Sequence, residues 1–241
     1  MTPLQSQLFE MMKVFDAFCK EHELQYCLAW GTLLGAKRHK GFIPWDDDVD
    51  LAMTRSSFEK LKQLAVDGKL PEGLVFEDSY FTKGCAIPKI RDKRTGLVDN
   101  SNGVGIFLDI YPMDNYSSFS ASLFKLVRAG LIIRDRRKRI GNKALRLCYT
   151  FMSIFPYLIF AMVKKLYMHL PPAKTGVYVS TAPVTNPEFF FFQNEMYPFG
   201  TEEFEGMNLP VPHDVEAVLR LLYGGWETPV QTGNTHFKKE D

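Results

Sequence analysis

Apolar side chains recur at helical spacing in separate parts of the chain. An amphipathic helix is predicted over about the first twenty residues, where the apolar positions are Leu4, Leu8, Met11, Met12, Phe15, Phe18 and Cys19. A second helical pattern follows Pro212 and ends at Gly224, a residue type that commonly terminates helices. Between them, Ser56 and Glu59 form a capping-box pattern, which predicts a helix that runs to about Val66.

Short segments rich in apolar residues, several of them alternating with polar positions, predict strands between these helices. The predicted strands cover residues 25–30, 48–53, 74–77, 85–91 and 104–111. Gly31 follows the first strand and marks the turn into a helical pattern. The mixture of strands and helices predicts the α/β (α+β) fold class, with helices and a mixed sheet.

Four aspartates within five positions mark the second of these strands. Asp48 and Asp50 alternate with apolar neighbours, so the period of a strand places both carboxylates on the same face. Two adjacent carboxylates on a rigid strand usually need a cation between them, and hard oxygen ligands favour Mg²⁺ or Mn²⁺. Asp46 shares this parity if the strand begins early, whereas Asp47 is expected to face away and cap the loop.

A glycine turn after a strand, an acidic strand and a third acid on a later strand form the layout of a nucleotidyltransferase-type palm. Here these parts are Gly31 with Thr32, the pair Asp48 and Asp50, and Asp109. Backbone N–H groups at a glycine turn can cradle a phosphate, and carboxylates can hold the Mg²⁺ ions that neutralise phosphate charge. Each part alone has an ordinary interpretation, a plain turn or a solvated acidic loop. Their combination favours a site for phosphoryl transfer.

Basic side chains accompany the acidic strand. Lys37 and Arg38 lie close to it in sequence, and they either bind the phosphate of a donor or balance the aspartates. On the fourth predicted strand, alternation places Lys89 and Arg91 on one face with Lys93, which suits contacts with a diphosphate. The alternative is a solvated edge strand that uses lysines to prevent aggregation.

Residues 118–172 differ from the rest of the chain and are predicted to form a helical insertion, basic at first and then apolar. An uncharged run of about seventeen residues, 147–163, is interrupted by Pro156 and falls just short of the length that spans a bilayer. One interpretation is a peripheral contact with an anionic membrane or a polyprenyl-linked acceptor, to which each Lys or Arg adds roughly 1 kcal/mol. The alternatives are a helical hairpin packed on the catalytic domain and a true membrane-spanning helix.

The composition limits the class of protein. With 46% apolar residues and a net charge of +1, the chain is expected to be globular and to have no nucleic-acid partner. The cysteines show no metal-binding or disulfide pattern and the N-terminus shows no secretory signal, so a cytoplasmic location is expected. If the insertion contacts lipid, the protein lies on the inner face of the cytoplasmic membrane. The histidines show no ligand spacing, and the polar C-terminal residues are expected to fray.

The stretch from Gly31 to Met53, GTLLGAKRHKGFIPWDDDVDLAM, resembles the signature of the LicD family. Two further parts resemble this family, residues 88–95 with 105–114 and residues 204–212 with 222–224. The likeness spans roughly residues 10–230 and is strongest in the first stretch. The family includes phosphocholine transferases of bacterial surface polymers and is related to the fukutin-type transferases of phosphorylated sugar alcohols.

The resemblance implies a nucleotidyltransferase-like fold, with residues 1–241 as one catalytic domain that carries the insertion. It also implies Mg²⁺-dependent (or Mn²⁺-dependent) transfer of phosphocholine, or a similar phospho-alcohol, from a CDP-linked donor to a glycan hydroxyl. The acceptor would be a glycan or polyprenyl-linked glycan, such as a precursor of teichoic acid or lipopolysaccharide.

By the matching motif, Asp48, Asp50 and Asp109 would be the metal ligands and catalytic residues, and Asp109 could also take the proton of the acceptor. The candidate substrate-binding residues are Gly31, Thr32, Lys37, Arg38, Lys89 and Arg91. Two alternatives stay open: a nucleotidyltransferase that releases pyrophosphate, and a membrane-surface adaptor of the same fold without turnover.

Overall fold

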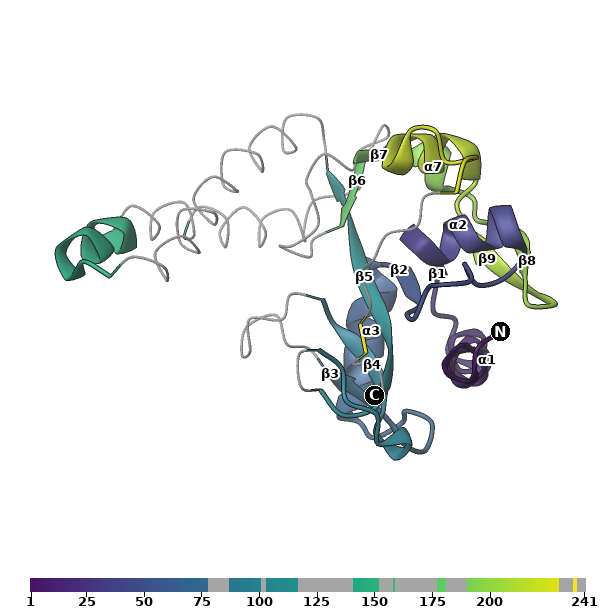
Figure 1. Ribbon diagram of the computed structural model, residues 1–241, viewed down its shortest axis with the longest axis horizontal. Helices are drawn as coiled ribbons and strands as arrows, with labels where there is room; N and C mark the ends of the chain where they lie inside the picture. Colours follow the sequence, from purple (N-terminus) through teal and green to yellow (C-terminus); the bar gives the residue numbers. More distant parts are fainter. Residues whose placement is uncertain are drawn as a thin grey trace. The chain divides into compact units, whose positions relative to one another are not determined.

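The computed structural model describes residues 1–77, 87–100, 103–116, 141–151, 158, 177–180, 190–229 and 236–237. The chain divides into two compact units, the first made of Met1–Asp114 and Ser180–Asp241 and the second of Asn115–Val179 (Figure 1). In the second unit, residues 143–151 are helical. Most of the insertion predicted at 118–172 lies outside the described residues. Within the described part of the chain, no helix has both the length and the apolar character needed to cross a membrane.

A mixed sheet forms the centre of the first unit. Its strands follow the spatial order β1 (Tyr26–Leu28), β2 (Asp50–Thr54), β5 (Ile106–Tyr116), β4 (Lys89–Asp92) and β3 (Leu74–Glu77). The neighbours β2 and β5 run parallel, while the other neighbouring pairs are antiparallel. This arrangement confirms the predicted mixed α/β class. The other described strands are β6 (Val177–Ser180), β7 (Phe190–Phe192) and the hairpin of β8 (Gly200–Phe204) and β9 (Met207–Val211).

The helices of the first unit follow largely from local sequence. α1 (Pro3–Glu21) is the predicted amphipathic helix, and Thr2 begins it with a capping box. α7 (Val215–Tyr223) ends before Gly224, as predicted. α3 (Arg55–Val66) begins after Thr54, whose hydroxyl accepts a hydrogen bond from the Ser57 N–H, so the predicted capping box at Ser56 is wrong. The others are α2 (Trp30–His39), α6 (Gln193–Met196) and the 3₁₀ turn η1 (Lys93–Thr95).

The central position of β2 and β5 buries residues 50–53 and 106–113, whichever face of the sheet they occupy. The core contains Leu51 and Met53 of β2, Leu108 and Ile110 of β5, and side chains of α1 and α3 that include Leu8, Met12, Phe15 and Leu61. Figure 1 shows α2, α7 and the β8–β9 hairpin gathered beside β1 and β2. The polar side chains of Asp50 on β2 and Asp109 on β5 therefore lie in an environment from which water is largely excluded.

Candidate functional site

Three carboxylates meet where β2 runs beside β5. Asp50 is the first residue of β2 and pairs in register with Asp109 of β5, while Asp48 comes two residues before the strand. Oxygens of the three side chains lie within 4.8 Å of one another, and all three residues are buried. The predicted strand includes Asp48, whereas the observed strand begins at Asp50. A hydrogen bond from the Asp109 N–H to the Val49 carbonyl (2.8 Å) holds the preceding run beside β5.

Burial dominates the electrostatics of this carboxylate cluster. It raises the pKa of Asp109 to about 6, although the Lys89 ammonium acts in the opposite direction. Burial and the neighbouring charges of Asp48 and Asp109 raise the pKa of Asp50 well above its usual range. Raised carboxyl pKa values mean that the protein does not fully compensate the negative charge of the ionised cluster. Three buried oxygen ligands with surplus negative charge fit a hard divalent cation such as Mg²⁺ or Mn²⁺.

Lys89 of β4 supplies a positive charge to the cluster. Its ammonium forms an ion pair with Asp109, and the residue is buried. The Lys89 Nζ also lies 3.4 Å from the centre of the Phe107 ring, a cation–π geometry that holds the side chain against β5. Lys89 therefore reaches the candidate site, and its predicted contact with a donor phosphate stays a prediction.

Asp46 also faces the cluster. Its side chain shares a hydrogen bond with Asp48, and burial together with the charge of Asp48 raises the pKa of Asp46 to about 7. A Cβ atom on Gly31 would lie 2.9 Å from Asp46 Oδ2 and 3.8 Å from Asp50 Oδ2. The absence of a side chain at Gly31 thus leaves room for two carboxylates. The spacing of two between Asp46 and Asp48 predicts that both side chains lie on one face. It does not assign a role to Asp46.

The start of α2 is fixed against the first residue of β2. The Thr32 hydroxyl is buried and accepts a hydrogen bond from the Asp50 N–H (2.9 Å), and the Ala29 N–H donates to the Asp50 carbonyl (3.0 Å). The first N–H groups of a helix have no partner within the helix, and they favour a bound phosphate. These hydrogen bonds and the short distance from Gly31 to Asp46 place Gly31 and Thr32 beside the carboxylates. The predicted role of Gly31 and Thr32 in phosphate binding stays a prediction.

Aromatic side chains surround the same region. The Tyr111 hydroxyl hydrogen-bonds to Asp50, and its pKa is raised well above the usual range by burial and by the nearby carboxylates. The rings of Tyr111 and Trp30 lie 5.1 Å apart. Burial and the charge of Asp50 also raise the pKa of Tyr223 on α7. Trp30 has a φ of 41°, a strained conformation for a residue other than glycine and one that is often found at functional sites.

The basic residues near the end of α2 contact groups on other elements. Lys37 Nζ lies 3.4 Å from Glu202 of β8 and 3.6 Å from Glu216 of α7. Arg38 donates to the carbonyl of Trp226 (3.2 Å), and its charge opposes the rise in the pKa of Tyr223. The structure therefore brings Arg38 within electrostatic reach of a tyrosine near the cluster, while Lys37 pairs with acidic residues of β8 and α7.

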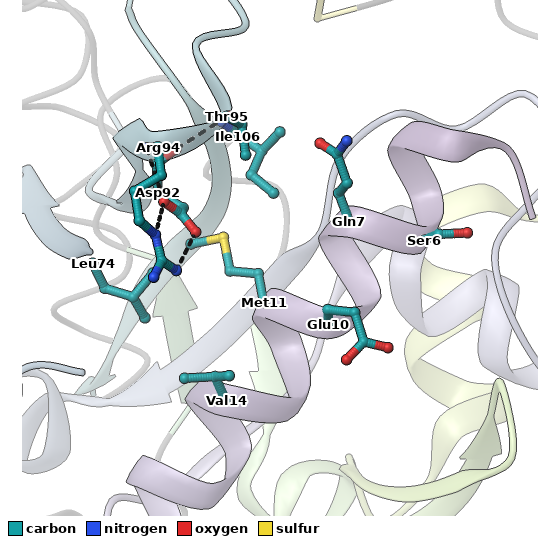
Figure 2. Close-up of a pocket in the computed structure, with 10 residues that line it drawn as sticks. All are labelled: Ser6, Gln7, Glu10, Met11, Val14, Leu74, Asp92, Arg94, Thr95 and Ile106. Atoms are coloured by element: carbon teal, nitrogen blue, oxygen red, sulfur yellow. Dashed lines mark hydrogen bonds and ion pairs between the residues drawn. The ribbon is translucent and has the colours of Figure 1, made fainter. Parts of the chain in front are cut away.

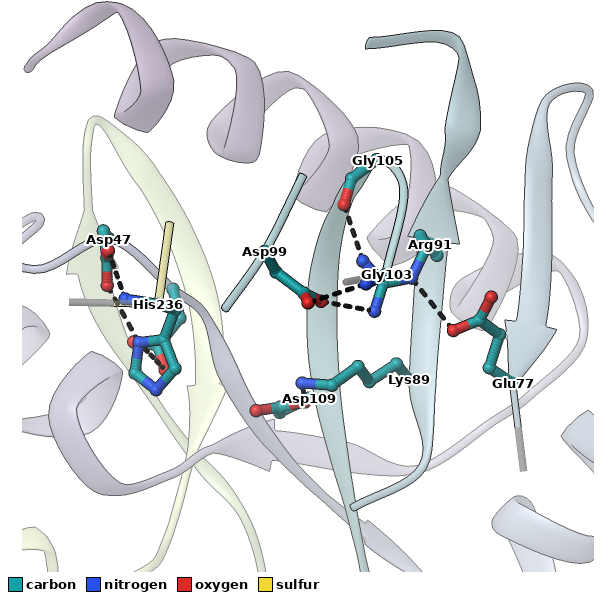
Figure 3. Close-up of polar contacts among 10 residues, drawn as sticks. Asp47, Glu77, Lys89, Arg91, Asp99, Gly103, Gly105, Asp109 and His236 are labelled. Carbon is teal, nitrogen blue, oxygen red and sulfur yellow. Dashed lines mark hydrogen bonds and ion pairs between the residues drawn. The ribbon is translucent and has the colours of Figure 1, made fainter. Parts of the chain in front are cut away.

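Arg91 belongs to a second cluster, in which Arg91 and Asp99 are buried and Glu77 is half-buried (Figure 3). It is 2% exposed, and its guanidinium donates to Glu77 (2.9 Å), to Asp99 (2.9 Å) and to the Gly105 carbonyl (2.7 Å). These bonds engage three of the five guanidinium N–H groups, and the predicted contact of Arg91 with a substrate stays a prediction. The interpretation of β4 as a solvated edge strand is wrong, because β4 lies between β5 and β3 and is buried throughout. Lys93 belongs to η1 and not to the strand.

Asp47 binds the C-terminal part of the chain, which the sequence analysis expected to fray (Figure 3). Its carboxylate accepts the backbone N–H groups of His236 (2.6 Å) and Phe237 (3.2 Å) and lies 2.8 Å from His236 Nδ1. Burial acts to raise the pKa of Asp47, but these hydrogen bonds outweigh it and lower the pKa. The same side-chain contact raises the pKa of His236 to about 9. The contact between His236 and Asp47 cannot be predicted from local sequence, because 189 positions separate the two residues.

A separate pocket of about 360 Å³ lies between α1 and the strands β3 and β4 (Figure 2). Met11, Val14, Leu74 and Ile106 give it apolar walls, and the ion pair between Arg94 and Asp92 (2.7 Å) lies at one side. None of the described residues that line it belongs to the carboxylate cluster or to the predicted site. The pocket is therefore not a candidate for the active site.

Comparisons with known proteins agree with the resemblance noted in residues 31–53. Residues 23–128, which include the whole carboxylate cluster, match the family described as LicD/FKTN/FKRP, nucleotidyltransferase domain. The lipopolysaccharide cholinephosphotransferase LicD of Haemophilus influenzae is 48% identical over 143 residues, which cover 56% of this chain and 52% of that protein. The chain thus spans about half the length of this relative.

Two shorter matches are to uncharacterised proteins. One, from Rickettsia prowazekii, is 37% identical over 57 residues, which cover 24% of this chain and 21% of that protein. The other, from Rickettsia typhi, is 41% identical over 46 residues, which cover 19% of this chain and 15% of that protein.

Proposed function

We propose that this chain is a transferase that moves phosphocholine, or a similar phospho-alcohol, to a hydroxyl of a cell-surface glycan, because residues 23–128 match the nucleotidyltransferase domain described as LicD/FKTN/FKRP. The observation that carries the proposal is the buried carboxylate cluster of Asp48, Asp50 and Asp109 inside the matched segment. The cholinephosphotransferase activity named for the Haemophilus influenzae relative supports the class of transferred group.

The donor in this proposal is a CDP-linked alcohol, and the acceptor is a glycan or a polyprenyl-linked glycan. The oxygen of the acceptor hydroxyl bonds to the phosphorus that carries the alcohol. The bond between this phosphorus and the CMP oxygen breaks, and CMP leaves with the bonding electron pair. The hydroxyl proton passes to a carboxylate of the cluster, for which Asp109 is the candidate from the sequence.

In this proposal, Asp48, Asp50 and Asp109 hold one or two Mg²⁺ or Mn²⁺ ions. When bound, the cation neutralises phosphate charge and helps to hold the reacting oxygens in line. The chain's own groups bind and orient the donor: the N–H groups of Gly31 and Thr32 face a phosphate oxygen, and Lys89 adds a positive charge next to Asp109. The buried setting of these groups strengthens each electrostatic contact.

The test is CMP release from a panel of CDP-linked alcohols with Mg²⁺ and a glycan acceptor. The wild type is compared with Asp48→Asn and with the control Asp67→Asn, which changes an exposed aspartate at the end of α3. We expect CMP release that depends on the donor and the metal, is lost in Asp48→Asn and is kept in Asp67→Asn. The donor that is used identifies the transferred alcohol.

Two other results would each contradict the proposal in a different way. Release of pyrophosphate from a nucleoside triphosphate, without CMP release from any CDP-linked donor, would identify a nucleotidyltransferase. Absence of both reactions, with the fold intact, would identify an adaptor without turnover.

We also propose a cytoplasmic location, with contact between the basic segment around residues 125–146 and the anionic inner face of the cytoplasmic membrane. High salt should release such a peripheral protein from isolated membranes, because salt screens the attraction between exposed charges. Recovery of all the protein in the supernatant at low salt would contradict membrane contact and leave the transferase proposal unaffected.

A further inference from the structure

We call His236 and Phe237 the C-terminal clasp, because together they occupy both oxygens of Asp47. Figure 3 shows His236 beside Asp47. The backbone N–H groups of both residues donate to Asp47 Oδ2, at 2.6 and 3.2 Å, and His236 Nδ1 lies 2.8 Å from Oδ1. His236 Nδ1 also lies 3.3 Å from Asp48 Oδ2, so the clasp reaches a residue of the carboxylate cluster directly. Both oxygens of Asp47 are engaged by the clasp, so Asp47 connects the clasp to the loop that carries Asp48.

The clasp is itself anchored on the sheet. Phe237 is buried, and its ring stacks on Phe107 of β5 with 5.4 Å between the ring centres. The Asn100 N–H donates to the His236 carbonyl (2.8 Å), and Asp99 forms an antiparallel bridge with Phe237. Arg91 holds this receiving loop in place through Asp99. A continuous set of contacts therefore connects Arg91 to Asp47 through the clasp.

The loop that carries Asp46, Asp47 and Asp48 needs such support. It has no regular secondary structure, and its carboxylates repel one another. Gln5 of α1 holds the first part of the loop by donating to the carbonyls of Ile43 (3.0 Å) and Asp46 (2.9 Å). The clasp holds the next part, between Asp46 and the start of β2.

We propose that His236 and Phe237 are positioning residues, which hold Asp47 and thereby keep Asp48 in place to bind a divalent cation with Asp50 and Asp109. This role rests on the proposed metal centre. It also gives Arg91 a function in the site, because Arg91 orders the loop on which the clasp docks. Neither clasp residue needs to touch the substrate.

The direct test is the dissociation constant of Mn²⁺, measured on the full chain by titration for the wild type, His236→Ala and His236→Asn. His236→Ala removes the Nδ1 contacts with Asp47 and Asp48, and loss of a hydrogen bond that orients a ligand typically weakens metal binding roughly 10-fold to 100-fold. Asn places an amide N–H close to the position of Nδ1, so His236→Asn should restore most of the affinity. His213→Ala is the control, since His213 is an exposed histidine before α7.

A second pair of variants tests the anchor. Phe237→Ala removes the ring that stacks on Phe107 and should weaken Mn²⁺ binding, while Phe237→Leu keeps an apolar side chain there and should retain most of the affinity. Thermal unfolding without metal shows whether each variant is folded. In CMP release, we expect His236→Ala to lower kcat more than it raises the KM for the donor, because the clasp acts on the metal ligands.

The outcomes separate this inference from the function on which it rests. Equal Mn²⁺ affinity in the wild type and His236→Ala would overturn the positioning role and leave the metal centre intact. So would a folded His236→Asn that binds as weakly as His236→Ala. If the wild type itself binds no Mn²⁺, the metal centre fails, and the role of the clasp fails with it.

Discussion

Two buried clusters of charge lie on neighbouring strands of one sheet, and they differ in how their charges are balanced. In the Arg91 cluster, one guanidinium donates to two carboxylates and a carbonyl, all at 2.9 Å or less. In the carboxylate cluster, Asp48, Asp50 and Asp109 face one another, with Lys89 as a close cation on Asp109. Lys93 also pairs with Glu77 (3.5 Å), so the first cluster has two cations for its two carboxylates, whereas the second carries surplus negative charge.

This difference separates a structural network from a binding site. Burying charged groups is costly unless partners compensate them, and the hydrogen bonds of Arg91 provide that compensation. The carboxyl groups of Asp50 and Asp109 instead have raised pKa values, because burial and the neighbouring carboxylates disfavour their ionised forms and Lys89 offsets only part of this effect. A bound cation would supply further positive charge. Substitutions in the Arg91 cluster should therefore act mainly on stability, and substitutions in the carboxylate cluster mainly on metal binding and turnover.

The largest effect is expected from Asp50→Asn. The substitution removes a ligand of the proposed metal ion, which would stabilise transition-state charge by several kcal/mol. CMP release should therefore fall by several orders of magnitude. The fold should persist, because the substitution removes a buried charge that its neighbours repel. Circular dichroism and urea denaturation without metal check the fold, and a variant with wild-type turnover would refute the assignment of Asp50.

Arg91→Met is expected to lower the stability of the fold, whereas Asp50→Asn is expected to lower turnover. Removal of one partner from a buried ion pair typically costs about 3–5 kcal/mol, so the free energy of unfolding in urea should fall by that amount. Arg94→Met is the matched control, because Arg94 also pairs with an aspartate but its side chain is 62% exposed, and little change is expected. Equal losses of stability in the two variants would contradict the contrast between buried and exposed pairs.

The stability of the metal-free protein should depend on pH through the carboxylates near the candidate site. The folded-state pKa values of about 7 for Asp46 and about 6 for Asp109 lie above the ordinary value of 3.8. At a pH between 3.8 and these values, Asp46 and Asp109 bind more protons in the folded state than in the unfolded state. The free energy of unfolding should therefore fall as the pH rises from about 4 to about 7.

Mn²⁺ should change this dependence. Metal binding requires ionised carboxylates, so the stabilisation by Mn²⁺ should grow as the pH rises from about 5 to 7. Thermal melts over this range, with and without Mn²⁺, provide the measurement. A stabilisation by Mn²⁺ that is constant across the range would count against the carboxylates as the binding groups.

A smaller effect is expected from Gly31→Ala. The added Cβ would lie 2.9 Å from Asp46 Oδ2, so the carboxylate must move, and overpacking of this kind costs about 1 kcal/mol or more. Mn²⁺ binding should weaken by a few-fold. Gly200→Ala serves as the control, because the nearest atom to its Cβ would be 3.7 Å away.

The parts of the fold that depend on local pattern were predictable. The sequence alone indicates the helix at Pro3–Glu21, the strand at Leu74–Glu77 and the helix that stops at Gly224. The approach of Asp48 and Asp50 also follows from their spacing. Asp109 was assigned to the same site from its place on a later strand, and the parallel pairing of β2 with β5 brings it there.

The remaining parts depend on contacts between distant positions. Alternation along β4 places Lys89 and Arg91 on the same face of the strand. It does not predict that the guanidinium of Arg91 is buried against Glu77 and Asp99, because these partners come from other segments. His236 lies in a polar segment, and contacts with the distant residues Asp47, Asp48 and Asn100 hold it in place. Local periodicity contains no information on either contact.

The central claim is that the carboxylate cluster binds a divalent cation, and a Mn²⁺ titration of the wild type and Asp109→Asn tests it most directly. The wild type should bind Mn²⁺ saturably, and Asp67→Asn should bind it equally well. In Asp109→Asn the loss should exceed the roughly 100-fold that removal of a supporting hydrogen bond can cost, because a ligand itself is lost. Equal affinity of the wild type and Asp109→Asn would contradict the claim.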